Sequence, residues 1–435
     1  MEKIYKIAFH TLGCKLNYSE TSAISRTLDS SKFEVVPYKE LADIYIINTC
    51  AVTGSAEKKC RTLIHAAHRR NPEAHIGLIG CFSELKPEEL SIIDGVDIVL
   101  GSGNKFSLAQ KIESLLFDNQ ETITEVNPEA HLEFHSSWSS GERTRSFLKI
   151  QDGCDYHCSY CTVCIARGES RSDSISHVVV NAREIVSSNI KEIILTGVNI
   201  GDFGRKTGES FADLLRELIK IEGLERVRIS SIEPNLLTDE IIELVSKSEK
   251  LMPHFHIPLQ SGSNKILKLM QRRYLREVFA TRVSKAKALI PNCFIAADVI
   301  VGFPNEQDED FEETFQFLEQ MDLQALHVFS YSIRPNTIAG EMDQQVPEYQ
   351  KKIRSKRLIE LSSKMTLDFY HKQVGKVYPI LAESSQHQGN MSGFTPNYIK
   401  CSFPYNNNLS NKIIQGQIER IDISTETAIV TIINN

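Results

Sequence analysis

The sequence predicts an α/β protein in three parts: an amino-terminal domain built on a parallel sheet, a second series of parallel strands, and a small antiparallel β-barrel. Three observations lead to this prediction. Short apolar runs alternate with helical patterns over the first hundred residues, and the same alternation returns over residues 147–332. The final segment, residues 371–435, instead holds short β-rich runs separated by Gly, Pro and Asn. Alternating strands and helices favour parallel sheets, whereas closely spaced short strands favour a barrel.

The amino-terminal pattern sets apolar strands between stretches with helical spacing. Strands are expected at 6–9, 44–47, 76–79 and 97–100, and helices at 18–30, 55–70 and 86–92. A polar stretch without a clear period follows, which favours a connection between domains. We therefore expect an amino-terminal domain (1–118), a linker (119–142), a second domain (143–370) and a carboxy-terminal barrel (371–435).

The second domain repeats the strand–helix alternation six times. Its strands are expected at 147–150, 192–195, 227–230, 255–258, 295–301 and 326–331, and its helices at 178–189, 209–221, 236–248, 264–290 and 308–320. Six parallel strands with crossover helices fit either an incomplete (β/α)6 barrel or an open sheet, and the pattern alone does not choose. Residues 346–372 are expected to form one further helix, and 377–382, 413–421 and 428–433 strands of the carboxy-terminal barrel.

The composition is typical of a soluble globular protein, with 41% hydrophobic and 24% charged residues. No stretch approaches the ~20 apolar residues of a membrane span, and the first residues lack a secretory signal. These features predict a cytoplasmic protein with no membrane association. The net charge of −7 argues against a uniformly basic nucleic-acid-binding surface, although it allows a local one. Four of the ten cysteines lie within residues 154–164, which favours metal binding over a disulfide framework.

Cys154, Cys158 and Cys161 have the spacing that suits an iron–sulfur cluster. Three thiolates can hold three irons of a 4Fe–4S cluster and leave the fourth iron open to a ligand. The alternative is a structural zinc site, for which Cys164 or His157 supplies the fourth ligand. The cysteines follow the first strand of the βα series, where a barrel assembles its active site, and this position favours the cluster.

Cys14, Cys50 and Cys81 are distant in sequence, but each follows a predicted strand of the amino-terminal sheet. The carboxyl ends of parallel strands share one edge of a sheet, so these thiols are expected to converge. The alternative is that they are separate buried cysteines that pack as small hydrophobes. Cys60 falls inside a predicted helix and is expected to be a packing residue.

With both sets of cysteines, the chain resembles the methylthiotransferase family of radical S-adenosylmethionine (SAM) enzymes over nearly its whole length. The resemblance implies a radical SAM partial barrel followed by an RNA-binding barrel of the TRAM type. It also implies two 4Fe–4S clusters and two SAM molecules. One SAM, bound to the open iron of the Cys154–Cys161 cluster, generates a radical that removes hydrogen from an unactivated carbon. The other methylates a sulfur on the auxiliary cluster held by Cys14, Cys50 and Cys81.

The local sequence resembles the branch of the family that acts on threonylcarbamoyladenosine in tRNA. The residues that carry this resemblance are Lys15, after the first cysteine, and Thr53, after Asn48-Thr49-Cys50-Ala51-Val52. The alternatives are the branches that modify isopentenyladenosine in tRNA or an aspartate of a ribosomal protein. A non-enzymatic zinc- or RNA-binding protein is the alternative outside the enzymes. Cys164 stands where the family usually has a proline, and we expect it to pack near the cluster.

Four residues at predicted strand ends are similar to SAM contacts of the family: Gly197, Asn199, Glu233 and Gln260. Arg272 and Tyr274 lie in a Met-x-Arg-x-Tyr sequence that the family shares, and the resemblance suggests contact with RNA or SAM. The implied partners are a tRNA carrying threonylcarbamoyladenosine in its anticodon loop and an electron donor of the flavodoxin or ferredoxin type.

A basic segment precedes the carboxy-terminal barrel. Residues 350–376 contain eight Lys or Arg against Glu360 and Asp368, a local charge of +6. Such a segment attracts phosphate, although it can also be an ordinary solvated helix. The predicted RNA contacts are Lys351, Lys352, Arg354, Lys356 and Arg357. Four aromatic residues of the barrel are candidates for base stacking: Tyr378, Phe394, Tyr398 and Phe403.

Overall fold

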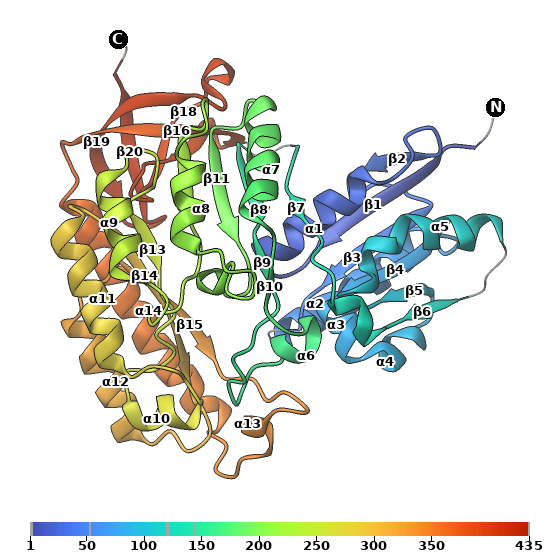
Figure 1. Ribbon diagram of the computed structural model, residues 1–435, viewed down its shortest axis with the longest axis horizontal. Coiled ribbons are helices and arrows are strands. Elements are labelled where there is room, and N and C mark those ends of the chain that lie inside the picture. The colour runs from blue at the N-terminus through green and yellow to red at the C-terminus, as the bar shows by residue number, and fades with distance from the viewer. Residues whose placement is uncertain (1–2, 52–53, 119–121, 142–143, 434–435) are drawn as a thin grey trace.

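The computed structural model describes residues 3–51, 54–118, 122–141 and 144–433. It confirms the α/β fold, with the amino-terminal domain beside a large barrel domain and the carboxy-terminal barrel at the opposite end from α13 (Ile338–Glu341) (Figure 1). Thr53 lies outside the described residues.

A six-stranded parallel sheet of order β2-β1-β3-β4-β5-β6 forms the amino-terminal domain. Apolar residues on its two faces pack against the helices in two clusters. The expected linker contributes to this sheet, because β6 pairs with β5 in parallel. The strands are β1 (Tyr5–Thr11), β2 (Phe33–Val36), β3 (Ile44–Thr49), β4 (His75–Gly80), β5 (Val96–Leu100) and β6 (Ile123–Glu125). The helices are α1 (Lys15–Arg26), α2 (Gly54–Arg70), α3 (Cys81–Leu85), α4 (Pro87–Ser91), η1 (Asn104–Ser107) and α5 (Leu108–Phe117).

The second domain is a partial barrel of six parallel strands. Short β7 (Ser137–Trp138) borders one sheet of order β12-β11-β8-β7, and a second sheet has the order β13-β14-β15. Parallel bridges from Val227 to Leu251 and from Ser231 to His256 join the two sheets. The strands are β8 (Arg145–Lys149), β11 (Glu192–Thr196), β12 (Arg226–Ile229), β13 (His254–His256), β14 (Phe294–Val301) and β15 (Ala325–Ser330).

Helices cover the outside of the partial barrel (Figure 1). The expected helix at 264–290 is two helices, because residues 270–275 leave the helical path to approach the cysteine loop. The helices are α7 (Ile175–Ser187), α8 (Phe211–Leu218), α9 (Asp239–Lys247), α10 (Asn264–Leu269), α11 (Arg276–Leu289) and α12 (Asp308–Gln320).

Side chains alternate between the two faces of each barrel strand. Outward-facing apolar residues such as Leu148, Ile193 and Val299 pack against the surrounding helices in one large core. The residues between them face inward and are largely polar, with Lys149 and Asp298 as examples. The barrel therefore has a polar interior.

The carboxy-terminal barrel follows the long helix α14 (Glu348–His371). Its strands close in the order β16-β17-β18-β20-β19, all antiparallel except the pair β18–β20. Its core includes Phe294 of β14 and Phe369 of α14, so it shares packing with the second domain. The strands are β16 (Val377–His387), β17 (Asn390–Phe394), β18 (Lys400–Pro404), β19 (Ile413–Asp422) and β20 (Thr427–Ile432). Among the described residues, none of the helices has both the length and the apolar character that a membrane crossing requires.

Candidate functional site

The predicted cluster loop lies at the carboxyl end of β8. Short strands β9 (Gln151–Asp152) and β10 (Arg171–Ser172) pair at the base of the loop, and α6 (Val163–Arg167) begins directly after it. Two of its sulfurs accept backbone hydrogen bonds: Tyr156 N lies 3.3 Å from Cys154 Sγ, and Val163 N lies 3.4 Å from Cys161 Sγ. Such donors stabilise a thiolate.

Arg272 supplies a donor to the third sulfur, since its Nη1 lies 3.1 Å from Cys158 Sγ. The side chain is buried and forms an ion pair with Glu233. Tyr274 is also buried and donates to the carbonyl oxygen of Pro258 at 2.5 Å. The structure therefore corrects the expectation of RNA contact for both residues: Arg272 supports the cysteine loop, and Tyr274 holds the segment that carries it.

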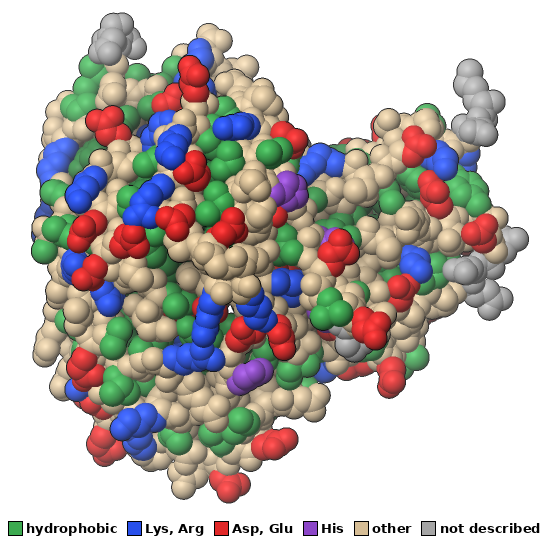
Figure 2. All heavy atoms as spheres, in the orientation of Figure 1, with side chains coloured by type: hydrophobic (Ala, Val, Ile, Leu, Met, Phe, Trp, Pro, Cys, Tyr) green, Lys and Arg blue, Asp and Glu red, His purple; other side chains and the backbone are tan. Residues whose placement is uncertain are grey.

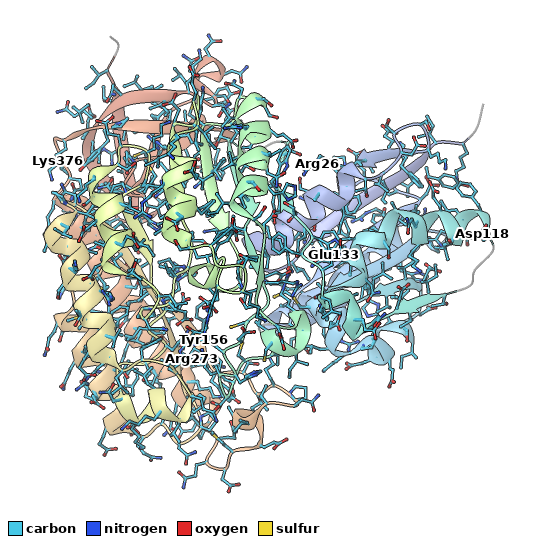
Figure 3. The ribbon with its side chains drawn as sticks, in the orientation of Figure 1. Arg26, Asp118, Glu133, Tyr156, Arg273 and Lys376 are labelled. Carbon is cyan, nitrogen blue, oxygen red and sulfur yellow. The ribbon has the colours of Figure 1, made fainter. Side chains whose placement is uncertain are left out.

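The outside of the loop is held by Arg273. Its guanidinium lies 3.9 Å from the centre of the Tyr156 ring and donates to the carbonyl oxygen of Asp155 at 2.7 Å. Figure 3 shows Tyr156 and Arg273 side by side near the end of the barrel that holds the loop. The Tyr156 hydroxyl in turn accepts a hydrogen bond from Asn235 at 2.9 Å. The cysteine loop is thus fixed from the inside and the outside.

The amino-terminal cysteines lie at the ends of three adjacent strands, as the sequence predicts. Cys14 and Cys50 follow β1 and β3, and Cys81 begins α3 directly after β4. Gly13 has φ +98°, and a Cβ atom at this position would lie 2.9 Å from Cys50 Sγ. The glycine therefore lets the backbone before Cys14 pass close to Cys50.

The two groups of cysteines meet through α6 and α3, which pack against each other. One helix directly follows Cys161, and the other begins at Cys81. Arg167, at the end of α6, donates to Asn17 Oδ1 at 2.6 Å. Burial lowers the pKa of Arg167, but the negative charges of Cys81, Glu20 and Asp152 outweigh burial and raise this pKa well above its ordinary value.

A fully buried carboxylate, Glu20, lies at this junction. Its oxygens pair with Lys105 at 2.5 Å, Lys149 at 2.9 Å and Arg167 at 3.0 Å. Burial opposes the ionisation of Glu20, yet these three cations hold its pKa far below the ordinary range. Because Lys149 and Arg167 belong to the barrel domain, the ion network joins the two domains beside both groups of cysteines.

The four predicted SAM residues lie at the same end of the barrel as the cysteine loop. Asn199 is buried with Oδ1 unpaired, and Gln260 lines a cavity together with Cys161. Burial raises the pKa of Glu233, although Arg272 opposes this effect. At Gly197 a Cβ atom would lie 2.9 Å from Oε1 of buried Gln151, so the glycine accommodates that side chain.

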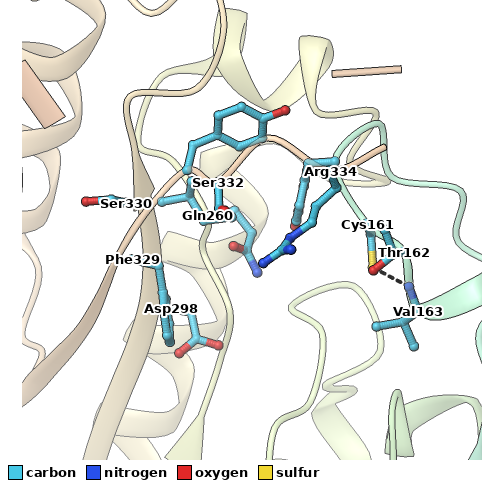
Figure 4. A pocket seen from close by; sticks show the side chains of 12 residues that line it. Cys161, Thr162, Val163, Gln260, Asp298, Phe329, Ser330, Ser332 and Arg334 are labelled. Carbon is cyan, nitrogen blue, oxygen red and sulfur yellow. Dashed lines mark hydrogen bonds between the residues drawn. The ribbon is translucent and has the colours of Figure 1, made fainter. Parts of the chain in front are cut away.

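The cavity beside Cys161 has a volume of about 220 Å³. Figure 4 shows Gln260, Asp298 and Arg334 around it. His256 Nε2 lies 2.6 Å from Asp298 Oδ1, and His327 Nδ1 lies 3.1 Å from the same oxygen. Burial favours a raised pKa for Asp298, but these hydrogen bonds outweigh it and hold the pKa at about 2. Asp298 interrupts the apolar run 294–301, and this interruption is the signal by which sequence reasoning could have found it.

A second cavity, of about 350 Å³, lies where the three parts of the chain meet. Lys15, His254 and Tyr398 contribute to its lining, one from each part. Phe394 also lines it and stacks on Tyr398 with a centroid separation of 5.0 Å. Phe403 instead lies in the core of the carboxy-terminal barrel, which excludes the expected base stacking there.

The basic helix α14 is less available to RNA than its sequence suggests. Lys351 is 2% exposed and donates to the carbonyl oxygen of Tyr331 at 3.0 Å, and Arg354 is 4% exposed and pairs with Glu306 at 2.6 Å. Arg357 pairs with Glu312 at 3.0 Å. The expectation of phosphate contact is therefore wrong for Lys351 and Arg354, while Lys352 and Lys356 are exposed. Figure 2 shows another face of the barrel domain, on which basic and acidic side chains are interspersed.

Each group of thiols suits the metal group that the sequence predicts. The Cys154–Cys161 loop offers three sulfurs, and each accepts a hydrogen bond from the surrounding protein. The amino-terminal set offers three sulfurs at one sheet edge, with Ser102 Oγ 3.7 Å from Cys81 Sγ. Three thiolates with hydrogen-bond donors to sulfur are the donor set of a 4Fe–4S cluster that keeps one iron open.

Comparison with known proteins places the chain in a family. Residues 6–101 match uncharacterized protein family UPF0004, and residues 148–318 match the radical SAM superfamily. The chain is 39% identical over 420 residues to the threonylcarbamoyladenosine tRNA methylthiotransferase MtaB of Bacillus subtilis, covering 95% of this chain and 93% of the relative. It is 34% identical over 428 residues to the tRNA-2-methylthio-N(6)-dimethylallyladenosine synthase of Carboxydothermus hydrogenoformans, covering 96% and 97%.

Solved structures agree in fold. The radical S-adenosylmethionine methyltransferase TsrM from Kitasatospora setae aligns with a TM-score of 0.56 at 12% identity, over 88% of this chain and 79% of that chain. The two family matches together span the cysteine-bearing domain and most of the partial barrel. The chain therefore belongs to the MtaB family of radical SAM methylthiotransferases.

Proposed function

We propose that this chain is a transferase that attaches a methylthio group to carbon 2 of N6-threonylcarbamoyladenosine beside the tRNA anticodon. The observation that carries the proposal is the adjacency of two separate groups of three thiols, joined through α6 and α3. Relatives named threonylcarbamoyladenosine tRNA methylthiotransferase, at 35–39% identity over most of the chain, identify the substrate.

The different roles of the two groups of thiols follow from the reaction. An aromatic C–H bond is not usefully acidic at neutral pH, so its cleavage needs a cofactor. When bound, a 4Fe–4S cluster at Cys154, Cys158 and Cys161 supplies the electron that cleaves SAM, and one at Cys14, Cys50 and Cys81 supplies sulfur. The requirement for a separate sulfur-bearing iron supports two clusters and two SAM molecules.

Residues of this chain fix the geometry in which the two groups cooperate. Arg272 holds Cys158, and the Glu20 network holds the barrel strand β8 against the amino-terminal domain. Gly197, Asn199, Glu233 and Gln260 surround the same end of the barrel, which supports a SAM site there. We infer an electron donor of the flavodoxin or ferredoxin type and a cytoplasmic location. We also infer domains at 1–118, 143–370 and 371–435, with a linker at 119–142 whose strand β6 joins the amino-terminal sheet.

The cavity at the three-part junction supports tRNA binding, because Lys15 in its lining directly follows Cys14. The Lys15 side chain lines the cavity and has no hydrogen bond or ion pair to the side chains or backbone of other described residues. Phe394 and Tyr398 supply aromatic surface. Lys352 and Lys356 add exposed positive charge on α14. Phosphate attraction and aromatic contact are the ordinary means of binding single-stranded RNA.

Mass spectrometry of tRNA nucleosides tests the proposed reaction. A strain that lacks this gene should accumulate N6-threonylcarbamoyladenosine and lose its 2-methylthio derivative, and the gene should restore the product. The Cys158→Ala variant should fail to restore it, whereas Cys60→Ala, a change at a fully buried thiol of α2, serves as the matched control. A product derived instead from dimethylallyladenosine, or label in a ribosomal protein, would assign the chain to another branch.

Iron analysis after anaerobic purification tests the number of clusters. Cys50→Ala should reduce bound iron from about eight to about four per chain, because one of two 4Fe–4S clusters is lost. It should retain SAM cleavage and lose the methylthio product. Near-normal product from a folded Cys50→Ala protein would show that the amino-terminal cysteines are structural.

A further inference from the structure

Arg334 is a buried cation that the proposed chemistry does not yet use. It follows β15, is 6% exposed, and lines the cavity that also contains Cys161 and Gln260. Its Nη1 donates to Glu57 of α2 in the amino-terminal domain. Its Nε and Nη2 are buried and have no hydrogen-bond partner among the described residues. In Figure 4 the guanidinium extends toward the amide of Gln260, in the middle of the cavity.

The two unpaired nitrogens form one edge of the guanidinium. The N–H groups of Nε and Nη2 point in the same direction, as a fork that matches the two oxygens of a carboxylate. A buried Arg nitrogen without a hydrogen-bond partner costs folding free energy. Two such nitrogens on the same edge therefore indicate a ligand that accepts a hydrogen bond from each. A planar oxyanion with two adjacent oxygens satisfies both at once.

The acidic residues near this edge are bonded to other groups, so the edge can accept an added anion. Asp298 is the acidic residue that lines the same cavity, and His256 and His327 bond to its Oδ1. Glu57 is held on the opposite side of Arg334 by Nη1 and by Lys86 at 3.7 Å. Neither carboxylate occupies the free edge.

We propose that the Nε–Nη2 edge of Arg334 binds the carboxylate of the threonylcarbamoyl group. This inference rests on the proposed function, because threonylcarbamoyladenosine carries a carboxylate that plain adenosine lacks. The position agrees with the chemistry: the cavity borders Cys161, and Arg334 itself bonds to the amino-terminal domain that carries the other cysteines. The substrate must lie between these two groups. A carboxylate of SAM is the other source of the same chemistry.

The binding of two tRNAs to the cluster-loaded protein tests the proposal. They have identical sequence, one with threonylcarbamoyladenosine and the other with unmodified adenosine at the target position. The wild-type protein should bind the modified tRNA at least tenfold more tightly. Arg334→Gln should bind both with the affinity that the wild type has for the unmodified tRNA. Arg334→Lys keeps the charge but not the fork, and should keep only part of the preference.

Three controls separate the possible sources of the anion. Arg183→Gln removes an exposed cation of α7, on the outside of the partial barrel, and should keep the full preference. SAM affinity should be the same in Arg334→Gln and wild type; a fall in SAM affinity with the tRNA preference intact would overturn the proposal in favour of SAM. An equal loss of affinity for both tRNAs would overturn the proposal and indicate that Arg334 binds a backbone phosphate. If Arg334→Gln fails to fold, as judged by thermal melting, Arg334→Lys decides: an unreduced preference overturns the proposal.

The outcome for the proposed function is read separately. Wild-type protein that forms 2-methylthio product from the modified tRNA, while the Arg334 variants keep its full preference, would reject this inference alone. Wild-type protein that forms no such product would reject the proposed function itself.

Discussion

At the scale of single residues, local backbone geometry decides whether the cysteine sulfurs can lie close together. Gly13 takes a φ that side chains rarely adopt, and it leaves no space for a Cβ atom beside Cys50. Tyr156 and Val163 contribute through backbone N–H groups, which no substitution removes except proline. Sequence spacing identifies the cysteines, whereas these supporting contacts depend on the path of the chain.

Gly13→Ala should damage the amino-terminal site while leaving the barrel site intact. The added Cβ would lie 2.8 Å from Cys50 Cβ and 2.9 Å from its Sγ, so Cys50 has to move. We expect about half of the iron to be lost, with SAM cleavage retained and methylthio product at least tenfold lower. Gly208→Ala is the matched control, because Gly208 also has positive φ but has open space around it. Full iron in Gly13→Ala would contradict this account.

His254 should make stability depend on pH. Burial, with Arg228 and Lys15 nearby, places the pKa of His254 well below its ordinary value, so the folded protein holds it neutral. The unfolded chain takes up a proton below about pH 6.5. The stability that neutral His254 contributes is therefore complete above that pH and falls by about 1.4 kcal/mol per pH unit below it.

The matching measurement is thermal melting of wild type and His254→Phe from pH 7.5 to 5.5. Phenylalanine keeps a ring against Phe294 and Tyr398 but has no titrating group. The melting temperature of the variant should fall less steeply with decreasing pH. Parallel curves for the two proteins would show that His254 does not contribute to the pH dependence.

At the scale of elements, one carboxylate joins parts that are remote in sequence. Glu20 of α1 receives cations from η1, β8 and α6. Neutralising Glu20 leaves the buried positive charges of Lys105, Lys149 and Arg167 without their main partner. This loss costs far more folding free energy than the loss of an exposed ion pair. The helix α1 also carries Lys15 and follows Cys14, so its position matters for the site as well as for stability.

Glu20→Gln should destabilise the protein by about 3–5 kcal/mol, because it breaks a buried ion network. Urea unfolding at neutral pH measures this loss. The control is Glu113→Gln, which removes a half-exposed ion pair with Lys32 and should cost less than about 1 kcal/mol. If both variants unfold at the same urea concentration, the network does not hold the two domains together.

At the scale of the whole molecule, tRNA has to reach a site that borders three parts of the chain. The basic helix α14 contributes fewer free charges than its sequence suggests, since Lys351 and Arg354 are buried in ion pairs and hydrogen bonds. Lys352 and Lys356 remain exposed. Any phosphate contact by the first half of α14 therefore depends chiefly on these two lysines.

Lys352→Gln with Lys356→Gln should weaken tRNA binding and lower its salt dependence. Each lost phosphate contact reduces the slope of log affinity against log salt by about 1. Affinity at several salt concentrations measures both quantities. Lys220→Gln with Lys247→Gln removes the same charge from exposed positions beside α8 and on α9 and provides the comparison. Equal slopes for both double variants would show that α14 is an ordinary solvated face.

The sequence by itself determined the two groups of cysteines and the alternation of strands and helices that carries them. Parallel strands end on one edge, so Cys14, Cys50 and Cys81 could be assigned to neighbouring positions from local patterns alone. The structure agrees with that placement. The α/β alternation was equally visible, although β2, α5 and β6 were not predicted. The strands β2 and β6 have only four and three residues. Helix α5 has ten residues and buries Leu108, Ile112 and Leu115 at helical spacing, so its signal was present in the sequence.

Only the tertiary structure decided which charged residues serve the site and which serve the core. Lys351 and Arg354 appear in sequence as a basic helix, yet Glu306, far back in the chain, pairs with Arg354 and keeps it buried. Arg334 gave no signal in the sequence, because its cavity and its partner Glu57 come from remote segments. Local periodicity indicates which face of an element is apolar. The partner of a charge is set by contacts between distant segments, and these exist only in the folded chain.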